Sequence, residues 1–261
     1  MNKAEYLKRK EALKKEAPIF RKKCLKCLRP EEICLCNTFK AFDTKTRFII
    51  LMHPKEAKHE RVGTGRISHL LLKNSEIIVG DLFDQDQKVQ TILNNPENHC
   101  MILYPGIDSH NISDKRLTFS THKKLVLFII DGTWPCAKSM MRDSKTLHTI
   151  PKLSFTPPSQ SAFSIKQQPG EFCLSTIESL YQTLQGLKQS EIEILPNNEE
   201  DVLLKSLEKI VEFQMMCAND PARNHYRKSS YKAPSERKAS KKHITRKICF
   251  EPQNYKENYE P

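Results

Sequence analysis

Short apolar segments that alternate with amphipathic ones constrain the fold of this 261-residue chain more than any other feature. Four apolar runs have the length and composition of buried strands: Thr46–Met52, Glu76–Val79, Cys100–Leu103 and Leu125–Ile130. Helices are predicted over Gly65–Lys73, from Pro135 as the first helical residue to Met141, from Ser175 to about Leu187, and over Asp201–Met216. This alternation favours an α/β domain with a mostly parallel sheet and helices on both faces.

Polar or turn-forming residues follow three of the predicted strands directly. These clusters are His53-Pro54, Tyr104-Pro105-Gly106 and Asp131-Gly132-Thr133-Trp134. In open parallel sheets, ligands bind beyond the carboxyl ends of the strands. We therefore expect the three clusters to meet at one edge of the sheet and to form the functional site.

Asp131 and Trp134 are the strongest candidates within these clusters. Asp131 is suited to act as a general base or to hold a ribose or an amine, and the single tryptophan is suited to stack on a base or on adenine. The alternative is a structural turn with a capping aspartate and a core-packed tryptophan. His53 is the best placed of nine histidines, although a packed core histidine is the commoner case.

Gly63-Thr64-Gly65-Arg66 precedes the predicted helix at Gly65–Lys73. A glycine pair at a helix start suits anion binding or a close approach of the backbone. An ordinary turn at the entry to a helix explains the same residues equally well.

Four of the nine cysteines lie within 13 residues, in the pattern Cys24-x2-Cys27-x6-Cys34-x-Cys36. Two close cysteine pairs joined by a turn supply the four thiolates of a structural zinc site. An iron–sulfur cluster uses the same ligands, and four free cysteines are the remaining alternative. The odd total and the lack of a secretory signal argue against a disulfide framework.

The net charge of +12 is located at the two ends of the chain. Residues 1–23 contain nine Lys/Arg and three Glu, and residues 223–261 contain eleven Lys/Arg and four Glu. Basic segments bind phosphates without base specificity, although they also merely solubilise some proteins. We predict a basic N-terminal helix (1–23), a zinc knuckle (24–40), an α/β catalytic domain (41–221) and a largely disordered basic tail (222–261). A cytoplasmic location is expected, with no membrane segment.

Five motifs occur in an order that resembles the DTW-domain family, named for Asp-x-Thr-Trp. They are His53-Pro54-x-Glu56, Thr64-Gly65-Arg66, Tyr104-Pro105-Gly106, Asp131-Gly132-Thr133-Trp134-x2-Ala137-x2-Met140 and Leu174-Ser175-Thr176-x-Glu178. The two cysteine pairs also resemble bacterial members of the family. The resemblance covers residues 24 to about 225, including Arg223-x-His225-x-Arg227. Gly63 departs from the pattern, in which an asparagine precedes the threonine.

The resemblance implies a tRNA-uridine aminocarboxypropyltransferase. Such enzymes move the 3-amino-3-carboxypropyl group of S-adenosylmethionine to N3 of a uridine and release 5′-methylthioadenosine. The family is related to the SPOUT class, so the resemblance also implies a C-terminal trefoil knot. tRNA is the expected partner, and the knuckle, both tails, Arg223 and Arg227 are expected to contact its backbone. No obligatory protein partner is expected.

The resemblance also suggests roles for individual residues. The implied catalytic residues are Asp131, Thr133 and Trp134, with Asp131 taking or orienting the N3 proton. The implied cofactor-binding residues are His53, Thr64, Gly65, Arg66, Tyr104, Pro105, Gly106, Ser175, Thr176 and Glu178. Among these, Arg66 or Thr64 is expected to hold the cofactor carboxylate and Glu178 to pair with its ammonium. Two alternatives remain: an RNA methyltransferase with the same cofactor, and a non-catalytic RNA-binding zinc protein.

Overall fold

The computed structural model describes residues 22–59, 63–120, 122–165, 170 and 173–220, together with residues 4, 5 and 7. The predicted tail at 222–261 lies outside the described residues, and so does most of the predicted N-terminal helix. The elements in chain order are η1 (Glu31–Ile33), β1 (Arg47–Met52), α2 (Pro54–His59), α3 (Thr64–Leu71), β2 (Ser75–Val79), α4 (Gln87–Leu93), β3 (Asn98–Leu103), β4 (His110–Asn111), β5 (Lys124–Asp131), α5 (Trp134–Asp143), α6 (Lys145–His148), β6 (Lys152–Ser154), α7 (Thr176–Gln189), η2 (Pro196–Asn198) and α8 (Asp201–Asn219).

The six strands form one sheet in the order β2-β1-β5-β3-β6-β4. Every strand pair is parallel, which confirms the predicted parallel sheet. Met52 and Asp131, the last residues of β1 and β5, pair with each other, and Leu103, the last residue of β3, pairs with Ile129, two residues before the end of β5. The carboxyl ends of β1, β5 and β3 therefore lie side by side at one edge.

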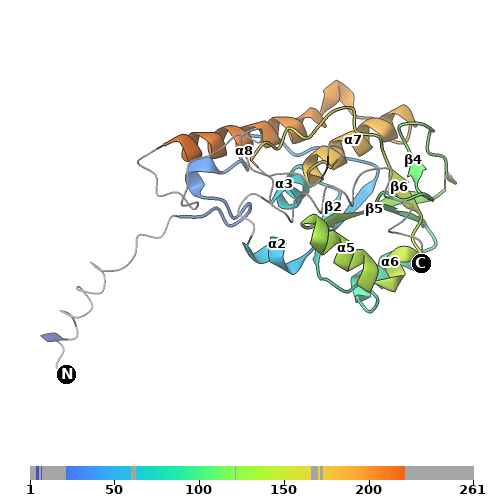
Figure 1. The fold of residues 1–261 in the computed structure, drawn as a ribbon, viewed down its shortest axis with the longest axis horizontal. Helices are drawn as coiled ribbons and strands as arrows, with labels where there is room; N and C mark the ends of the chain where they lie inside the picture. Colours follow the sequence, from blue (N-terminus) through green and yellow to red (C-terminus); the bar gives the residue numbers. More distant parts are fainter. Residues whose placement is uncertain are drawn as a thin grey trace.

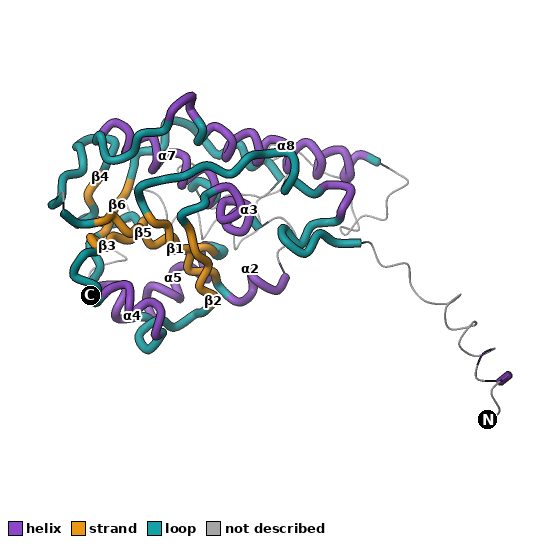
Figure 2. The backbone as a smooth tube through the Cα atoms, turned by 180° about the vertical axis from the view of Figure 1, so that it is seen from behind, coloured by secondary structure: helices purple, strands orange, loops and turns teal. Residues whose placement is uncertain are grey.

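Side chains of the central strands alternate between two hydrophobic clusters, one on each face of the sheet. Phe48 and Ile50 point to the cluster that includes α3, α7 and α8, whereas Ile49 and Leu51 point to the cluster that includes α4, α5 and α6. Figures 1 and 2 show these two helical layers above and below the strands. Because both faces are covered, each central strand reads as a continuous apolar run.

The predicted elements are present, with small shifts at their ends. Helix α5 begins at Trp134, one residue before Pro135, and α7 and α8 extend two to three residues beyond the predicted ends. The structure adds elements that were not predicted, and these are η1, α2, α4, β4, α6, β6 and η2. No helix in the described part of the chain combines the length and the apolar character that crossing a bilayer requires.

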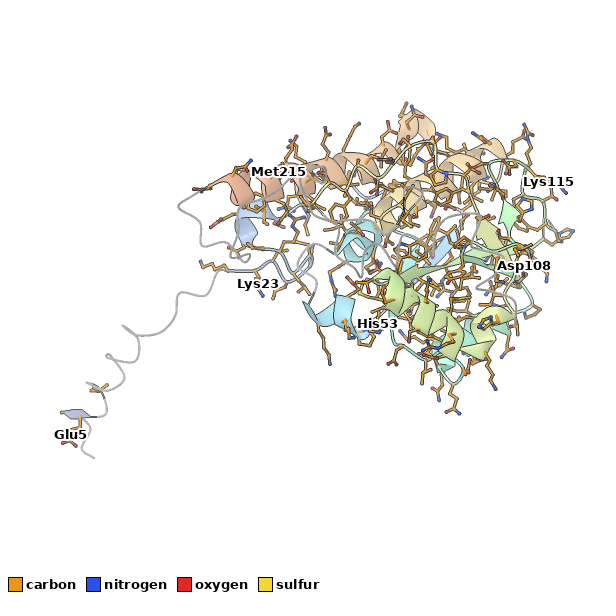
Figure 3. All side chains as sticks on the ribbon, viewed as in Figure 1. Glu5, Lys23, His53, Asp108, Lys115 and Met215 are labelled. Atoms are coloured by element: carbon orange, nitrogen blue, oxygen red, sulfur yellow. The ribbon has the colours of Figure 1, made fainter. Side chains whose placement is uncertain are left out.

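The cysteine knuckle packs against the same hydrophobic cluster as α3 and α8. Cys27 is 3% exposed, and Leu35 and Phe39 cover the cluster from outside. Lys23 and Met215, near the end of α8, lie at the end of the molecule opposite Asp108 and Lys115 (Figure 3). The knuckle therefore belongs to the folded body of the protein.

Candidate functional site

Asp131 is the last residue of β5, in the middle of the sheet edge. Its backbone carbonyl accepts a hydrogen bond from the N–H of His53 at 2.9 Å, which ties the turn after β1 to the end of β5. Asp131 is buried, with 4% of the residue exposed. Two of the predicted polar clusters, those at His53 and Asp131, are thus in direct contact.

The carboxylate of Asp131 lies between the first turns of two helices. The hydroxyl of Thr176, the first residue of α7, donates to Oδ1 of Asp131 at 2.6 Å. Gly65, in the first turn of α3, lies so close that a Cβ there would be 2.6 Å from Oδ1. Helix N-termini carry partial positive charge, so a carboxylate is favoured at this junction. Gly65 has no positive φ, and it is required there for space alone.

A cavity of about 260 Å³ opens beside this junction, at the carboxyl ends of β3, β5 and β6. Its walls are mainly apolar and aromatic, and Thr176, Ser154 and Ser179 contribute hydroxyl groups. The lining residues are Leu103, Tyr104, Pro105, Ile129, Ile130, Gly132, Trp134, Ala137, Leu153, Ser154, Phe155, Pro157, Gly170, Cys173, Leu174, Thr176 and Ser179. Such a cavity suits a flat organic ligand that bears a few polar groups.

The cavity unites residues from three of the predicted motifs. Tyr104 and Pro105, Gly132 and Trp134, and Thr176 line it. The remaining predicted site residues lie outside its lining, and these are His53, Thr64, Gly65, Arg66, Gly106, Asp131, Thr133, Ser175 and Glu178. The motifs therefore divide between residues that form the cavity wall and residues packed behind or beside it.

His53 and the turn at Thr64–Arg66 lie on the β1 side of Asp131. The N–H of Lys55 donates to Nδ1 of His53 at 3.1 Å, so a neutral His53 carries its proton on Nε2. Thr64 is buried, and Nη2 of Arg66 donates to the carbonyl of Ala57 at 3.4 Å. Arg66 thereby joins α3 to α2. Figure 3 shows His53 between α2 and α5.

Thr133 and Gly106 have local structural partners. Thr133 is exposed and donates to Sγ of Cys136 at 3.1 Å, within the first turn of α5. Gly106 lies against Lys152, whose ammonium binds both carboxylate oxygens of Asp108 at 2.9 and 3.0 Å. The Lys152–Asp108 ion pair therefore braces the loop that carries Tyr104 and Pro105 into the cavity.

Glu178 is 5% exposed, and donors from its own chain surround its carboxylate. Oε2 accepts from the N–H and hydroxyl of Ser175 and from the hydroxyl of Ser161, while Oε1 accepts from the N–H of Ala162 at 2.7 Å. Ser175 and Glu178 form the predicted capping box at the start of α7. Glu178 holds the segment before α7 in place.

Sequence reasoning missed the contribution of β6 and the segment after it. Ser154, Phe155 and Pro157 line the cavity, and Lys152 braces its rim. A three-residue strand gives no usable periodicity. The available signal was the pair Pro157-Pro158, which marks a turn directly after a short apolar run.

The sulfur atoms of Cys24, Cys27, Cys34 and Cys36 all lie within 4.8 Å of one another. Sγ of Cys24 is 3.8 Å from Sγ of Cys36, and Sγ of Cys27 is 3.7 Å from Sγ of Cys34. A tetrahedron with Zn–S bonds of about 2.3 Å has edges of about 3.8 Å. The spacing therefore fits a single metal ion, whereas the cysteine sulfurs around a four-iron cube lie farther apart.

Three of the knuckle thiols have shifted pKa values, each with its own cause. Backbone N–H groups of Cys27 and Lys26 lower the pKa of the Cys24 thiol to about 6. Burial, reinforced by hydrogen bonds with the neighbouring cysteines, raises the pKa of Cys36 to about 12. Burial contributes to a raised pKa of Cys34 as well. A bound cation would allow all four sulfurs to be thiolates together.

Comparison with known proteins identifies relatives over the same region. The family model described as DTW domain matches residues 21–215. tRNA-uridine aminocarboxypropyltransferase 2 of Drosophila melanogaster is 31% identical over 180 residues, which cover 66% of this chain and 69% of the fly protein.

Two further relatives carry similar names. The Mus musculus protein named tRNA-uridine aminocarboxypropyltransferase 2 is 25% identical over 198 residues, and the match spans 75% of this chain but only 64% of the mouse protein. tRNA-uridine aminocarboxypropyltransferase A of Arabidopsis thaliana is 27% identical over 216 residues, covering 73% of this chain and 80% of the plant protein. No solved structure matches the chain. The family match, which extends from the knuckle into α8, shows that this chain belongs to the DTW domain family.

Proposed function

We propose that this protein is a tRNA-uridine aminocarboxypropyltransferase, which transfers the 3-amino-3-carboxypropyl group of S-adenosylmethionine to N3 of a uridine. The observation that carries the proposal is that the motif naming the family forms one wall of the cavity at the sheet edge. Gly132 and Trp134 line that cavity, and Asp131 lies directly behind it. The names of the fly, mouse and plant relatives point to the same reaction.

The cavity suits the adenosine and sulfonium portion of the co-substrate. Tyr104, Trp134 and Phe155 offer aromatic surfaces for a purine, and the hydroxyls of Ser154, Thr176 and Ser179 are available for its polar groups. S-adenosylmethionine supplies an electrophilic carbon next to its sulfonium. Transfer of aminocarboxypropyl instead of methyl then depends on which carbon faces the uridine, so the cavity selects the reaction by positioning.

Asp131 acts in this proposal as a positioning residue. Asp131 is 4% exposed, and its carboxylate accepts a hydrogen bond from the hydroxyl of Thr176, which lines the cavity. The contact with Gly65 couples the same carboxylate to the turn at Thr64–Arg66. Asp131 would therefore fix Thr176 and the start of α3 relative to the reacting atoms. This burial favours orientation over direct removal of the N3 proton.

Other assignments remain part of the proposal. Arg66 or Thr64 would hold the carboxylate of the amino-acid portion, with His53, Gly65, Pro105, Gly106 and Ser175 shaping the surrounding turns. Trp134 would stack on a base, and Thr133, exposed beside it, would face the uridine. The contacts around Glu178 support a structural role for this residue in place of an ion pair with the cofactor ammonium.

The knuckle would hold one structural zinc ion through Cys24, Cys27, Cys34 and Cys36. Sulfur spacings of 3.7 and 3.8 Å support one metal ion in preference to an iron–sulfur cluster. A site closed by four thiolates has no position for substrate, so zinc would stabilise the knuckle without taking part in the transfer. The exposed side chains of Lys22, Lys23 and Lys26 would contact tRNA phosphates. The basic tails, Arg223 and Arg227 would extend that contact.

A SPOUT-like knot is also part of the proposal. Strand β6 lies between β3 and β4, so the chain leaves β6 from inside the sheet. It then returns to Asp131, where Thr176 begins α7. In a knotted cofactor site, the chain that follows the inner strand has to come back beside the central strand, as the start of α7 does here. A cytoplasmic location stays a prediction.

The reaction is tested by incubating tRNA from an unmodified source with the protein and S-adenosylmethionine, followed by mass spectrometry of digested nucleosides and small molecules. The proposal predicts one uridine heavier by one 3-amino-3-carboxypropyl group, with equimolar 5′-methylthioadenosine. A methylated nucleoside with S-adenosylhomocysteine would establish a methyltransferase instead. Stable tRNA binding without any new nucleoside, from several tRNA sources, would favour the RNA-binding alternative.

A further inference from the structure

Arg29 is a buried arginine that the proposed function does not use. It lies in the turn between the two cysteine pairs and is 2% exposed. Its Nε and Nη1 atoms are buried and have no hydrogen-bond partner among the described residues. A guanidinium remains charged at all physiological pH values, and burying an unpaired charge is strongly unfavourable. Something in its surroundings must therefore compensate the charge.

The backbone fixes where this guanidinium can reach. Leu28 has a φ of 58°, which turns the chain sharply before Arg29. The N–H of Cys24 donates to the carbonyl of Arg29 at 2.8 Å, and the N–H of Leu28 donates to the carbonyl of Cys24 at 2.9 Å. These bonds close the loop between Cys24 and Arg29. The arginine is thereby held at the base of the loop and inside the knuckle.

The sulfur atoms of the knuckle are the source of negative charge beside Arg29. Burial lowers the pKa of its guanidinium, while negative charge on Cys27 and Cys34 opposes that shift. None of the ion pairs formed by the described residues includes Arg29, and the nearby Glu31 and Glu32 are exposed. No carboxylate therefore provides the compensation within the described part of the chain.

We propose that Arg29 is the internal counter-charge of the metal centre, and that its buried guanidinium compensates the negative charge of the four thiolates. The inference rests on the metal ion of the proposed function. Four thiolates around a divalent ion leave a net charge of −2, and one guanidinium halves it. A guanidinium stays charged when it is buried, whereas a buried lysine loses its proton readily.

This arrangement makes retention of the zinc ion depend on Arg29. With zinc bound, the guanidinium is attracted to a centre whose net charge is −2, and loss of Arg29 would leave that charge uncompensated in a buried site. The metal is therefore expected to leave faster when the guanidinium is removed. A residue that only fills space would not change the rate of release.

The experiment uses the full chain loaded with zinc and compares Arg29→Met with Lys26→Met. Both variants lose one positive charge from the same loop, but the side chain of Lys26 is exposed and screened by water. The readout is the rate of zinc transfer to a colorimetric chelator. We expect Arg29→Met to release zinc about 10–100-fold faster than the wild type, as other outer partners of metal ligands do when removed. Lys26→Met is expected to change the rate by less than about threefold.

A second readout is the rise in Tm on loading each protein with zinc. We expect a smaller rise in Tm for Arg29→Met than for the wild type, and an intermediate rise for Arg29→Lys. If Arg29→Met does not fold, Arg29→Lys replaces it in both measurements. Wild-type release rates and an unchanged zinc-dependent rise in Arg29→Met would overturn the proposal. A wild-type chain that binds no zinc through its four sulfurs would also overturn it. Neither readout uses tRNA or S-adenosylmethionine, so failure here is separate from failure of the proposed transfer reaction.

Discussion

Gly65 and Asp131 touch across the junction of α3 and β5, with the backbone of the glycine lying against the carboxyl group of the aspartate. A Cβ on Gly65 would be 2.6 Å from Oδ1 of Asp131, so the two elements meet with no room for a side chain. The contact links two motifs that are 66 positions apart in the sequence. It also fixes the start of α3 relative to the cavity.

Gly65→Ala is therefore expected to displace either Asp131 or the first turn of α3. We expect stability to fall by about 1–3 kcal/mol, and kcat for tRNA modification to fall by about 100-fold because small misplacements are costly at a reacting centre. Gly186→Ala is the matched control, since its Cβ would be 2.6 Å from Cγ2 of Ile112, away from the cavity. Gly186→Ala should lower stability by a similar amount to Gly65→Ala, but the folded variant should keep the wild-type kcat. Equal losses of kcat in both variants would contradict the assignment.

Thr176→Val removes the hydroxyl that donates to Asp131, and Thr176→Ser retains it. If Asp131 is a positioning residue, Thr176→Val and Asp131→Asn should both lower kcat by about 10–100-fold without moving the acidic limb of the pH–rate profile. Thr176→Ser should remain close to the wild type. If Asp131 were the general base, only Asp131→Asn would abolish that limb, and Thr176→Val would retain it.

Glu178→Gln distinguishes a structural carboxylate from a cofactor ligand. Four donors from Ser161, Ala162 and Ser175 depend on the carboxylate, so the amide would leave a donor poorly paired and lower stability by about 1–3 kcal/mol. Isothermal titration with S-adenosylmethionine and with 5′-methylthioadenosine, which lacks the amino-acid portion, provides the discriminating readout. We expect the two affinities to fall by the same factor. A loss confined to S-adenosylmethionine would assign Glu178 to the ammonium instead.

His69 is expected to make stability depend on pH. Burial first, and then the nearby charge of Arg66, lowers the pKa of His69 in the folded protein. A histidine whose folded pKa is depressed contributes its stability above the unfolded pKa of about 6.5, and that stability is lost as the pH falls below this value. Urea unfolding at pH 7.5 and 5.5 should therefore show a larger loss for the wild type than for His69→Gln. Burial also depresses the pKa of His99, so part of the loss should persist in the variant. Equal losses in the two proteins would exclude His69 as a source.

Cys24→Ser is expected to lose metal and stability together. Three thiolates hold zinc less tightly than four, and the free energy of metal binding contributes to folding of the knuckle. We expect substoichiometric zinc by elemental analysis and a stability loss of about 3 kcal/mol or more. Cys100→Ser is the control, because Cys100 lies in the sheet and donates to the carbonyl of Ile92. Full zinc occupancy in Cys24→Ser would contradict the four-cysteine site.

The central strands could be predicted because each is long enough to be recognised as an apolar run. Thr46–Met52 and Leu125–Ile130 correspond to β1 and β5 within one residue at each end. Their polar endings also predicted that His53 and Asp131 would meet, which the backbone hydrogen bond between them confirms. This succeeded because strand ends in a parallel sheet share one edge whatever the rest of the fold does.

The elements that could not be predicted are short or depend on tertiary contacts. Strands β4 and β6 have two and three residues and exist through pairing alone. Helix α4 left a weak signal, because Asp86 caps it by accepting from the N–H of Val89. The engagement of Glu178 by Ser161 and Ala162 joins positions 16 and 17 residues apart across an irregular segment. No local pattern could have revealed these bonds.

The strand order has a consequence for how the protein is made. Among the described residues, β4 joins the sheet only through β6, which lies between β4 and β3 but follows both in the chain. During synthesis, β4 therefore has no strand to pair with until residue 154 has left the ribosome. The aromatic wall from β3, β6 and Phe155 and the hydroxyl of Thr176 come together only after that point. The ligand cavity is thus among the last parts of the domain to form during synthesis. A nascent chain cannot bind substrate there until nearly the whole domain has been made.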